Sequence, residues 1–468
     1  MIAAVALDLG TTSIKAGLLD RNGELHSIVA QPAPPITVSG ERYESSALAY
    51  AQTAEQVLAA CLAQTDSRPA LGLCSQRSSF LIWERASGQP ITPLISWQDK
   101  RGAPSCDALR DSAELIRTLT GLRLTPYYFA PKLRTLLQDN PHWRERLTRG
   151  ELLLGTLDTF LIWRWTDGKQ HVTDVSMAAR TLLLDTGLLM KTGLQQWSPA
   201  LCDLFDIPAG ILPHIKSSTG LNLPLNRGLV LQASAGDQSA ALVASIAGDS
   251  AEALVNLGTG GFVVRYLGHG NNSSNGYLQT LVYQDGTLPA HVALEGTLNS
   301  IAAALAPYPV AECRTADLAA TDIFCLAEPS GLGAPYFRSD IGLRFSASIE
   351  QLTPRQIAAL LLEGIIFRVA RIVEDFHRAS ALERVYLCGG LSELTCLQQG
   401  LAQCVPVEVY RLQQKDASLQ GAALLAAGME PASRRAAARI APAHNTPALA
   451  DKYRRWKHWF DLLLGSRS

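Results

Sequence analysis

Charged residues are scarce in this chain, and neither sign of charge predominates. Only 18% of the 468 residues are charged, and 41 Lys and Arg nearly balance 42 Asp and Glu, for a formal net charge of −1. Nucleic-acid binding needs a basic patch, so this balance argues against a nucleic-acid partner. With 47% hydrophobic residues, 36 Gly and 24 Pro, the composition excludes disordered, collagen-like and coiled-coil chains and indicates an enzyme of two or three domains.

Long apolar runs and paired cysteines are missing too. No run approaches the roughly 18 residues that a membrane helix needs, and Asp8 interrupts the first apolar stretch too early for a secretory signal. The nine cysteines contain no CxxC pair and are odd in number, which is typical of neither a zinc site nor a disulfide framework. We therefore expect reduced, mostly buried thiols, a cytoplasmic location and no membrane partner.

A short self-similarity recurs at half-chain spacing. Residues 5–18 and 253–266 align at an offset of 248, and each consists of an apolar run, a Leu-Gly-Thr turn and a second apolar run. This pattern predicts a β-hairpin. Two hairpins half a chain apart favour a duplicated α/β fold with a cleft between its halves, although a chance match is an alternative. We place the two domains at residues 1–230 and 231–468.

Local signals fit two α/β domains. Asn22-Gly23 predicts a second hairpin turn, and the Ala- and Leu-rich residues 45–62 predict a helix. Thr353, with Pro and Gln after it, predicts the start of a long buried helix. Near the end of the chain, an amphipathic helix with Tyr453, Trp456, Phe460 and Leu463 on one face is predicted to dock on the protein, the alternative being a membrane surface.

The first hairpin carries groups that suit phosphate chemistry. Within eight residues the sequence offers a carboxylate, a glycine, three hydroxyls and an amine, contributed by Asp8, Gly10, Thr11, Thr12, Ser13 and Lys15. Glycine lets the backbone approach a phosphate, hydroxyl and amine groups donate to its oxygens, and an aspartate can hold Mg²⁺. The alternative is an ordinary hairpin with a Gly-Thr turn.

Two further glycine-containing turns are candidate nucleotide contacts. If the halves face one another, the second hairpin turn, Gly258-Thr259-Gly260, would clasp the same polyphosphate as the first. A strand at 385–387 runs into Gly389-Gly390 with a helix-like sequence beyond, an arrangement that offers backbone N–H groups to an anion or a nucleotide. Neither GxxxxGK[ST] nor GxGxxG is complete, and glycines in such turns can be purely structural.

Asp237 is the candidate catalytic base. It follows Gly236 and precedes Gln238 and a helix-like segment. A carboxylate at a helix start is commonly a cap. Alternatively, phosphoryl transfer to an alcohol needs a carboxylate that accepts the proton of the hydroxyl.

These residues stand among motifs that resemble a known family. Eight motifs are very similar, in their order along the chain, to motifs of the FGGY carbohydrate kinases. They are WQDKR at 97–101, GTLDTFLIW at 155–163, HVTD at 171–174, ARTLL at 179–183, GDQSAAL at 236–242, LEG at 294–296, GAPY at 333–336 and GAA at 421–423. These enzymes belong to the actin/Hsp70/sugar-kinase superfamily, and the similarity to glycerol kinases is the strongest. It covers nearly the whole chain.

The resemblance implies two RNase H-like α/β domains with ATP and an acceptor meeting in the cleft between them. It assigns Asp237 as base, Asp8 to Mg²⁺, Thr11, Thr12, Ser13, Lys15 and Thr259 to the phosphates, and Gly390 to the adenosine. For the acceptor it points to Arg77, Trp97, Tyr127, Asp237, Gln238 and Phe262. Without the resemblance, Arg77 fits a surface charge and the three aromatic residues fit the core.

Departures from the family pattern concern both substrates. Ser78, which we also place in the acceptor site, replaces a glutamate that binds a glycerol hydroxyl in glycerol kinases, a swap that can change the substrate. Lys15 stands where these enzymes carry arginine. Ala302, Ala306 and Leu394 replace glycine, glutamine and asparagine on the nucleotide side, which weakens the expectation of adenine specificity.

The sequence therefore predicts an ATP- and Mg²⁺-dependent kinase that phosphorylates a primary hydroxyl of a small polyol or sugar. Glycerol is the first candidate acceptor, and four- to seven-carbon compounds such as erythritol, xylulose, ribulose and sedoheptulose are alternatives. A non-catalytic nucleotide or sugar sensor on the same fold is the alternative of another class. The sequence leaves open whether the protein forms a homodimer.

Overall fold

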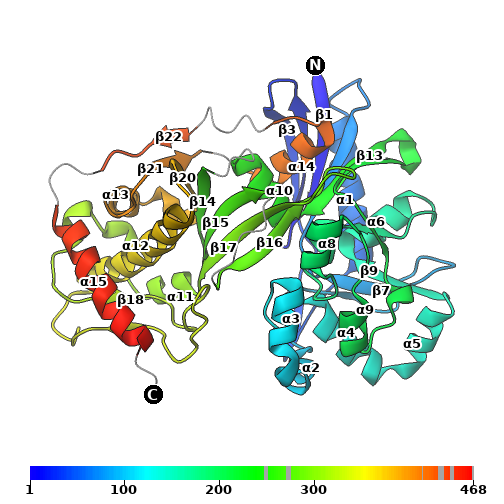
Figure 1. Ribbon diagram of the computed structural model, residues 1–468. Coiled ribbons are helices and arrows are strands. Elements are labelled where there is room, and N and C mark those ends of the chain that lie inside the picture. The colour runs from blue at the N-terminus through cyan, green and yellow to red at the C-terminus, as the bar shows by residue number, and fades with distance from the viewer. Residues whose placement is uncertain (247–250, 270–275, 414, 431–436, 443–446, 466–468) are drawn as a thin grey trace.

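A computed structural model of the chain describes residues 1–246, 251–269, 276–413, 415–430, 437–442 and 447–465. Two halves lie side by side, with the blue to green elements of the first at the right of Figure 1 and the yellow to red elements of the second mostly at the left. No helix in the described ranges is long and apolar enough to span a membrane. All nine cysteines are free thiols, and all except Cys106 and Cys388 are buried, as predicted.

The first half is built on a six-stranded sheet with the order β12-β13-β6-β1-β2-β3. Its strands are β1 (Ile2–Leu9), β2 (Ser13–Asp20), β3 (Leu25–Pro32), β6 (Ala70–Ser75), β12 (Thr219–Pro224) and β13 (Val230–Gly236). Both predicted N-terminal hairpins are confirmed, because β2 pairs antiparallel with β1 and with β3. Beyond β1, the strands β6 and β13 run parallel to it.

The second half repeats this arrangement in a seven-stranded sheet with the order β16-β17-β15-β14-β20-β21-β22. Its strands are β14 (Glu252–Leu257), β15 (Gly261–Gly268), β16 (Leu278–Tyr283), β17 (His291–Leu298), β20 (Arg384–Cys388), β21 (Glu408–Leu412) and β22 (Ala437–Arg439). The hairpin β14-β15 is antiparallel, and β20 and β21 continue parallel to β14. The strands β17-β15-β14-β20-β21 therefore match β3-β2-β1-β6-β13, and the predicted duplication is confirmed.

The predicted domain boundary near residue 230 needs a correction. It assigned β13 to the second domain, but β13 pairs in parallel with β6 and antiparallel with β12 in the first sheet. The second sheet begins only with β14 at Glu252. A strand joins the sheet whose edge it can pair with, and this choice is not visible in the local sequence.

The first half carries a second lobe, formed by residues 37–45 and by the segment between β6 and β12, that the sequence did not predict in detail. Its five-stranded sheet has the order β4-β5-β8-β7-β9. The strands are β4 (Thr37–Ser39), β5 (Arg42–Ser45), β7 (Phe80–Glu84), β8 (Leu94–Ile95) and β9 (Leu152–Thr156). The helices are α2 (Ala103–Ala108), α3 (Ala113–Thr120), α4 (Phe129–Asp139), α5 (Pro141–Thr148), α6 (Leu157–Trp165), α7 (Val175–Ala178), α8 (Thr186–Thr192) and α9 (Pro199–Leu204).

The predicted helices form as expected. Helix α1 (Ala47–Leu62) packs on the first sheet. Helix α12 (Pro354–Ala379) begins with the predicted capping box at Thr353 and lies in the core of the second half. The C-terminal helix α15 (Pro447–Gly465) docks there with Tyr453, Trp456 and Phe460 buried. Lys452, next to these residues in the same helix, is buried as well and forms an ion pair with Glu363.

Three shorter helices complete the second half. They are α11 (Ile301–Leu305), α13 (Thr395–Cys404) and α14 (Ala417–Ala427). Although α14 lies late in the chain, it packs against β1 and β6 of the first sheet and against α10 (Asp237–Ser245), as Figure 1 shows. This contact is rich in alanine and glycine, so the backbones approach closely.

Candidate active site

Three distant segments meet where parallel strands of the first sheet end. The register pairs Asp8 of β1 with Cys74 of β6, and Gly236 of β13 with Ser75 of β6. The carboxyl ends of parallel neighbours lie at one edge of a sheet, where α/β folds commonly bind ligands. Asp8, Arg77 and Asp237 are therefore neighbours in space.

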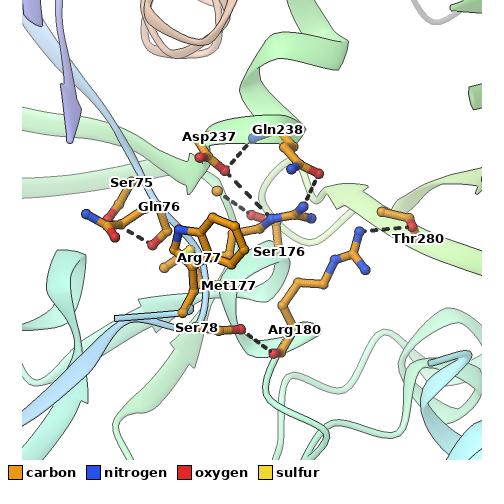
Figure 2. Close-up of polar contacts among 12 residues, drawn as sticks. Ser75, Gln76, Arg77, Ser78, Ser176, Met177, Arg180, Asp237, Gln238 and Thr280 are labelled. Carbon is orange, nitrogen blue, oxygen red and sulfur yellow. Dashed lines mark hydrogen bonds and ion pairs between the residues drawn. The ribbon is translucent and has the colours of Figure 1, made fainter. Parts of the chain in front are cut away.

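At this edge Asp237 interacts with Arg77 and Gln238 (Figure 2). Arg77 Nε lies 3.7 Å from Asp237 Oδ1, and the Arg77 guanidinium also donates to the Gln238 side chain. Asp237 is the first residue of α10, and its Oδ1 accepts the Gln238 N–H at 2.7 Å. Asp237 thus accepts a hydrogen bond within the first turn of α10, yet 31% of its side chain remains accessible to solvent. Burial raises the pKa of Asp237, and the charge of Arg77 opposes this rise.

Two of the motifs that resemble the FGGY family, GDQSAAL at 236–242 and HVTD at 171–174, support the backbone at this edge of the sheet. A Cβ at Gly236 would lie 2.7 Å from Cδ of Arg77, so glycine there lets the arginine side chain pass. The Gly236 N–H donates to Ser176 Oγ at 2.8 Å. Asp174, of the HVTD motif, accepts the N–H groups of Ser176 and Met177 at the start of α7. The motif therefore acts structurally, by holding the backbone that precedes Asp237.

A cavity of about 650 Å³ opens beside Asp237. All seven residues predicted for the acceptor line it, together with Thr11 of the first hairpin: Arg77, Ser78, Trp97, Tyr127, Asp237, Gln238 and Phe262. Trp97 and Tyr127 are 38% and 44% exposed, which excludes the core alternative for these two aromatics. The Trp97 indole Nε1–H donates to Thr11 Oγ1 at 3.1 Å and so links the cavity to the hairpin.

Ser78 lines the cavity, but its hydroxyl is already engaged. Ser78 Oγ donates to the backbone carbonyl of Arg180 at 2.9 Å. Buried Lys132 donates from Nζ to the carbonyls of Ser78 and Ser96, both at 2.9 Å. These bonds fix the loop around Ser78, so its side chain serves the architecture of the wall.

The structure adds lining residues that the sequence analysis missed. Arg180 and Glu295 form a buried ion pair at 3.4 Å, and both lie in motifs quoted for the family resemblance, so a signal for them existed. No comparable sequence signal pointed to the others: Arg123, Thr125, Tyr128, Leu278, Thr297, Asn299, Ser300, Ser330 and Phe337.

Asp8 is buried beside this site with one oxygen free of protein partners. Ser418 Oγ donates to Asp8 Oδ2 at 2.5 Å, whereas Oδ1 has no hydrogen-bond partner in the described part of the chain. Burial raises the pKa of Asp8 to about 6, and the charge of Asp237 adds to the rise. Lys15, opposite Asp8 in the hairpin, is paired with Asp416 at 2.5 Å.

The turns predicted for the nucleotide gather on the second sheet. Because β14 and β20 are parallel, with Asn256 opposite Cys388, Gly389 and Gly390 lie next to the turn Gly258-Thr259-Gly260. Gly389 has a φ of +90°, and a Cβ there would lie 2.4 Å from the Leu257 carbonyl oxygen. The Thr259 carbonyl accepts the N–H of Ala302 in α11, next to Ser300 in the cavity wall. None of these glycines lines the cavity.

Comparison with known proteins decides the family. Residues 3–256 match the N-terminal domain of the FGGY family of carbohydrate kinases, and residues 233–429 match its C-terminal domain. This chain belongs to the FGGY family. It is therefore a carbohydrate kinase, an enzyme that transfers a phosphoryl group to an alcohol acceptor.

The relatives of this FGGY kinase include glycerol kinases. It is 32% identical to a glycerol kinase of Shewanella amazonensis over 447 residues, covering 90% of this chain and 89% of the relative. It is 31% identical to glycerol kinase 2 of Streptomyces avermitilis, covering 90% of this chain and 87% of the relative.

Solved structures share the fold of this FGGY kinase. Plasmodium falciparum glycerol kinase with ADP superimposes with a TM-score of 0.82 at 23% identity, covering 98% of this chain and 97% of that one. Xylulose kinase from Rhodospirillum rubrum superimposes with a TM-score of 0.80 at 19% identity, covering 99% of this chain and 98% of that one.

Proposed function

We propose that this FGGY kinase uses ATP and Mg²⁺ to phosphorylate a primary hydroxyl of a small polyol or sugar held in the cavity. The observation that carries the proposal is the accessible Asp237 carboxylate, which lies beside Arg77 in the cavity wall. A base placed next to a cation in a concave site suits phosphoryl transfer, which mainly requires positioning and charge neutralisation.

In the proposed reaction, the acceptor oxygen attacks the γ-phosphorus of ATP, the bond to the β-phosphate oxygen breaks, and Asp237 takes the hydroxyl proton. A raised pKa makes the Asp237 carboxylate a better proton acceptor, and the positive charge of Arg77 at 3.7 Å opposes the rise by favouring the ionised form. Gln238 and Trp97 border the same space and would orient the acceptor hydroxyls. Closure of the two halves would exclude water as a competing acceptor.

The residues at the strand ends fit a divalent cation. Asp8 offers a buried, unpartnered Oδ1, and its pKa is raised partly by the nearby Asp237, so a cation would relieve the repulsion between the two carboxylates. Carboxylate oxygens together with substrate phosphates are the usual ligands of Mg²⁺. When bound, Mg²⁺ would neutralise charge on the phosphates. The backbone N–H groups of the turns at Thr11 and Thr259 are the proposed phosphate donors.

The Asp8→Asn variant tests the metal site without measuring turnover. Since burial raises the pKa of Asp8 from 3.8 to about 6, the folded state binds the proton more tightly, and ionising Asp8 costs stability as the pH rises from about 4 to 6. Without Mg²⁺, we expect the variant to be more stable than the wild type at pH 7.5, by up to about 3 kcal/mol. The difference should shrink toward pH 4 in urea unfolding.

Magnesium should raise the thermal midpoint of the wild type at pH 7.5 and leave that of Asp8→Asn unchanged. Asp20→Asn is the matched control, because half-buried Asp20 lies with exposed Glu24 and His26 in a second group of potential metal ligands. This control should keep the response to Mg²⁺. An equal Mg²⁺ response in wild type and Asp8→Asn would contradict the assignment of Asp8.

A coupled assay of ADP release tests the proposed function as a whole. The acceptors are glycerol, erythritol, xylulose, ribulose, sedoheptulose and gluconate, each compared with ATP and Mg²⁺ alone. We expect at least one acceptor to raise ADP release well above the rate without acceptor. If none does so, the proposed reaction is wrong. Glycerol is the acceptor that the names of the relatives favour, whereas Ser78 in place of the expected glutamate favours a different one.

A further inference from the structure

Arginine residues outnumber carboxylates around the cavity. Three arginines and two carboxylates line it: Arg77, Arg123, Arg180, Asp237 and Glu295. Arg77 faces Asp237 at 3.7 Å, and Arg180 faces Glu295 at 3.4 Å. Arg123 has no carboxylate within ion-pair distance among the described residues. The cavity therefore carries one unpaired positive charge.

Arg123 is held by an aromatic ring from the opposite half of the protein. It lies in the loop between α3 and α4 of the first half, and its guanidinium carbon is 4.1 Å from the ring centroid of Phe337 in the second half. A cation–π contact of this kind does not consume the N–H donors of the guanidinium, which remain available for hydrogen bonds. Arg123 is an exposed residue in the wall of the cavity, so these donors can meet a ligand.

Ser78 contributes no counter-charge to the cavity wall. Its hydroxyl is neutral and donates to the backbone carbonyl of Arg180. The carboxylates that line the cavity, Asp237 and Glu295, each already face another arginine. A neutral polyol would leave Arg123 without a counter-charge.

We propose that Arg123 binds a carboxylate of the acceptor, at the end remote from the hydroxyl that is phosphorylated, so that the substrate is a sugar acid of the aldonate class. A planar carboxylate can accept two parallel N–H bonds from one guanidinium, and one monoanion balances the unpaired charge. At about 650 Å³ the cavity has the size of pockets that take ligands much larger than a three-carbon polyol. The inference rests on the proposed kinase function of the same cavity.

The test compares acceptors of equal length that differ in the carboxylate. For the wild type we expect kcat/KM for gluconate to exceed that for glucitol by about 10-fold or more. We expect kcat/KM for erythronate to exceed that for erythritol by a similar factor. Arg123→Gln should lower the ratio of kcat/KM for gluconate to that for glucitol by about 10–100-fold, the range expected for a hydrogen bond to a charged group. The loss should come from a higher KM for gluconate. Arg123→Lys should restore the ratio only in part, because lysine cannot bind bidentately.

Arg110→Gln is the matched control, since Arg110 is 77% exposed and pairs with Asp107 on helix α2. It should keep the wild-type ratio. A wild-type preference for the neutral compounds would overturn the inference while leaving the kinase function intact. The same holds if Arg123→Gln raises the KM for ATP but not the KM for gluconate. If neither acids nor neutral polyols raise ADP release, the proposed function itself fails, and the inference fails with it.

Discussion

Replacing Asp237 with asparagine is expected to lower kcat by about 10²–10⁴-fold, the usual contribution of a general base. Asparagine keeps the size of the side chain and an oxygen that can accept the Gln238 N–H, which Asp237 Oδ1 now binds at 2.7 Å. It cannot take the proton of the acceptor hydroxyl. The KM for ATP should therefore change far less than kcat, and initial-rate kinetics over both substrates measure the two effects separately.

Asp185→Asn is the control for a purely structural carboxylate. Asp185 caps α8 and accepts the Leu188 N–H at 2.8 Å, away from the cavity. If Asp237 acted only as a first-turn carboxylate of α10, the two variants would lose similar stability and little turnover. A kcat of Asp237→Asn within threefold of the wild type would rule out its role as base.

The largest expected loss of stability follows from Gly421→Ala. A Cβ at Gly421 would lie 1.7 Å from the Ala240 carbonyl oxygen and 2.4 Å from its carbonyl carbon. Both are backbone atoms of α10, so α14 and α10 must separate. Overpacking typically costs about 1–3 kcal/mol, and we expect at least about 3 kcal/mol here because no flexible side chain can yield. Since α10 begins at Asp237, kcat should fall as well.

Urea unfolding measures this loss, with Gly210→Ala as the matched control. Gly210 lies in an exposed turn, and a Cβ there has no heavy atom within 4 Å. Its variant should stay within about 0.5 kcal/mol of the wild type. A Gly421→Ala protein that is as stable as Gly210→Ala would show that the two helices can adjust without cost.

The sequence already predicted much of the site, because several of its signals are local. The Gly-Thr turns, the Asn22-Gly23 turn and the cap at Thr353 each depend on a few neighbouring residues, and the corresponding hairpins and helix α12 are present. Asp237 was a candidate for the same reason, as a carboxylate placed between a strand and a helix. The motifs shared with the family extended this prediction to seven candidate acceptor residues, all of which line one cavity.

By itself the sequence determined the duplicated hairpins, the kinase family and the candidate base, since turn chemistry, helix caps and ordered motifs are written in short stretches of chain. Only the tertiary structure decided that β13 joins the first sheet, that the Ser78 hydroxyl bonds the cavity wall, and that the Arg123 guanidinium lies over the Phe337 ring across the two halves. Each of these contacts joins segments far apart in the chain, and their partners are selected by strand pairing and packing, which no local pattern encodes.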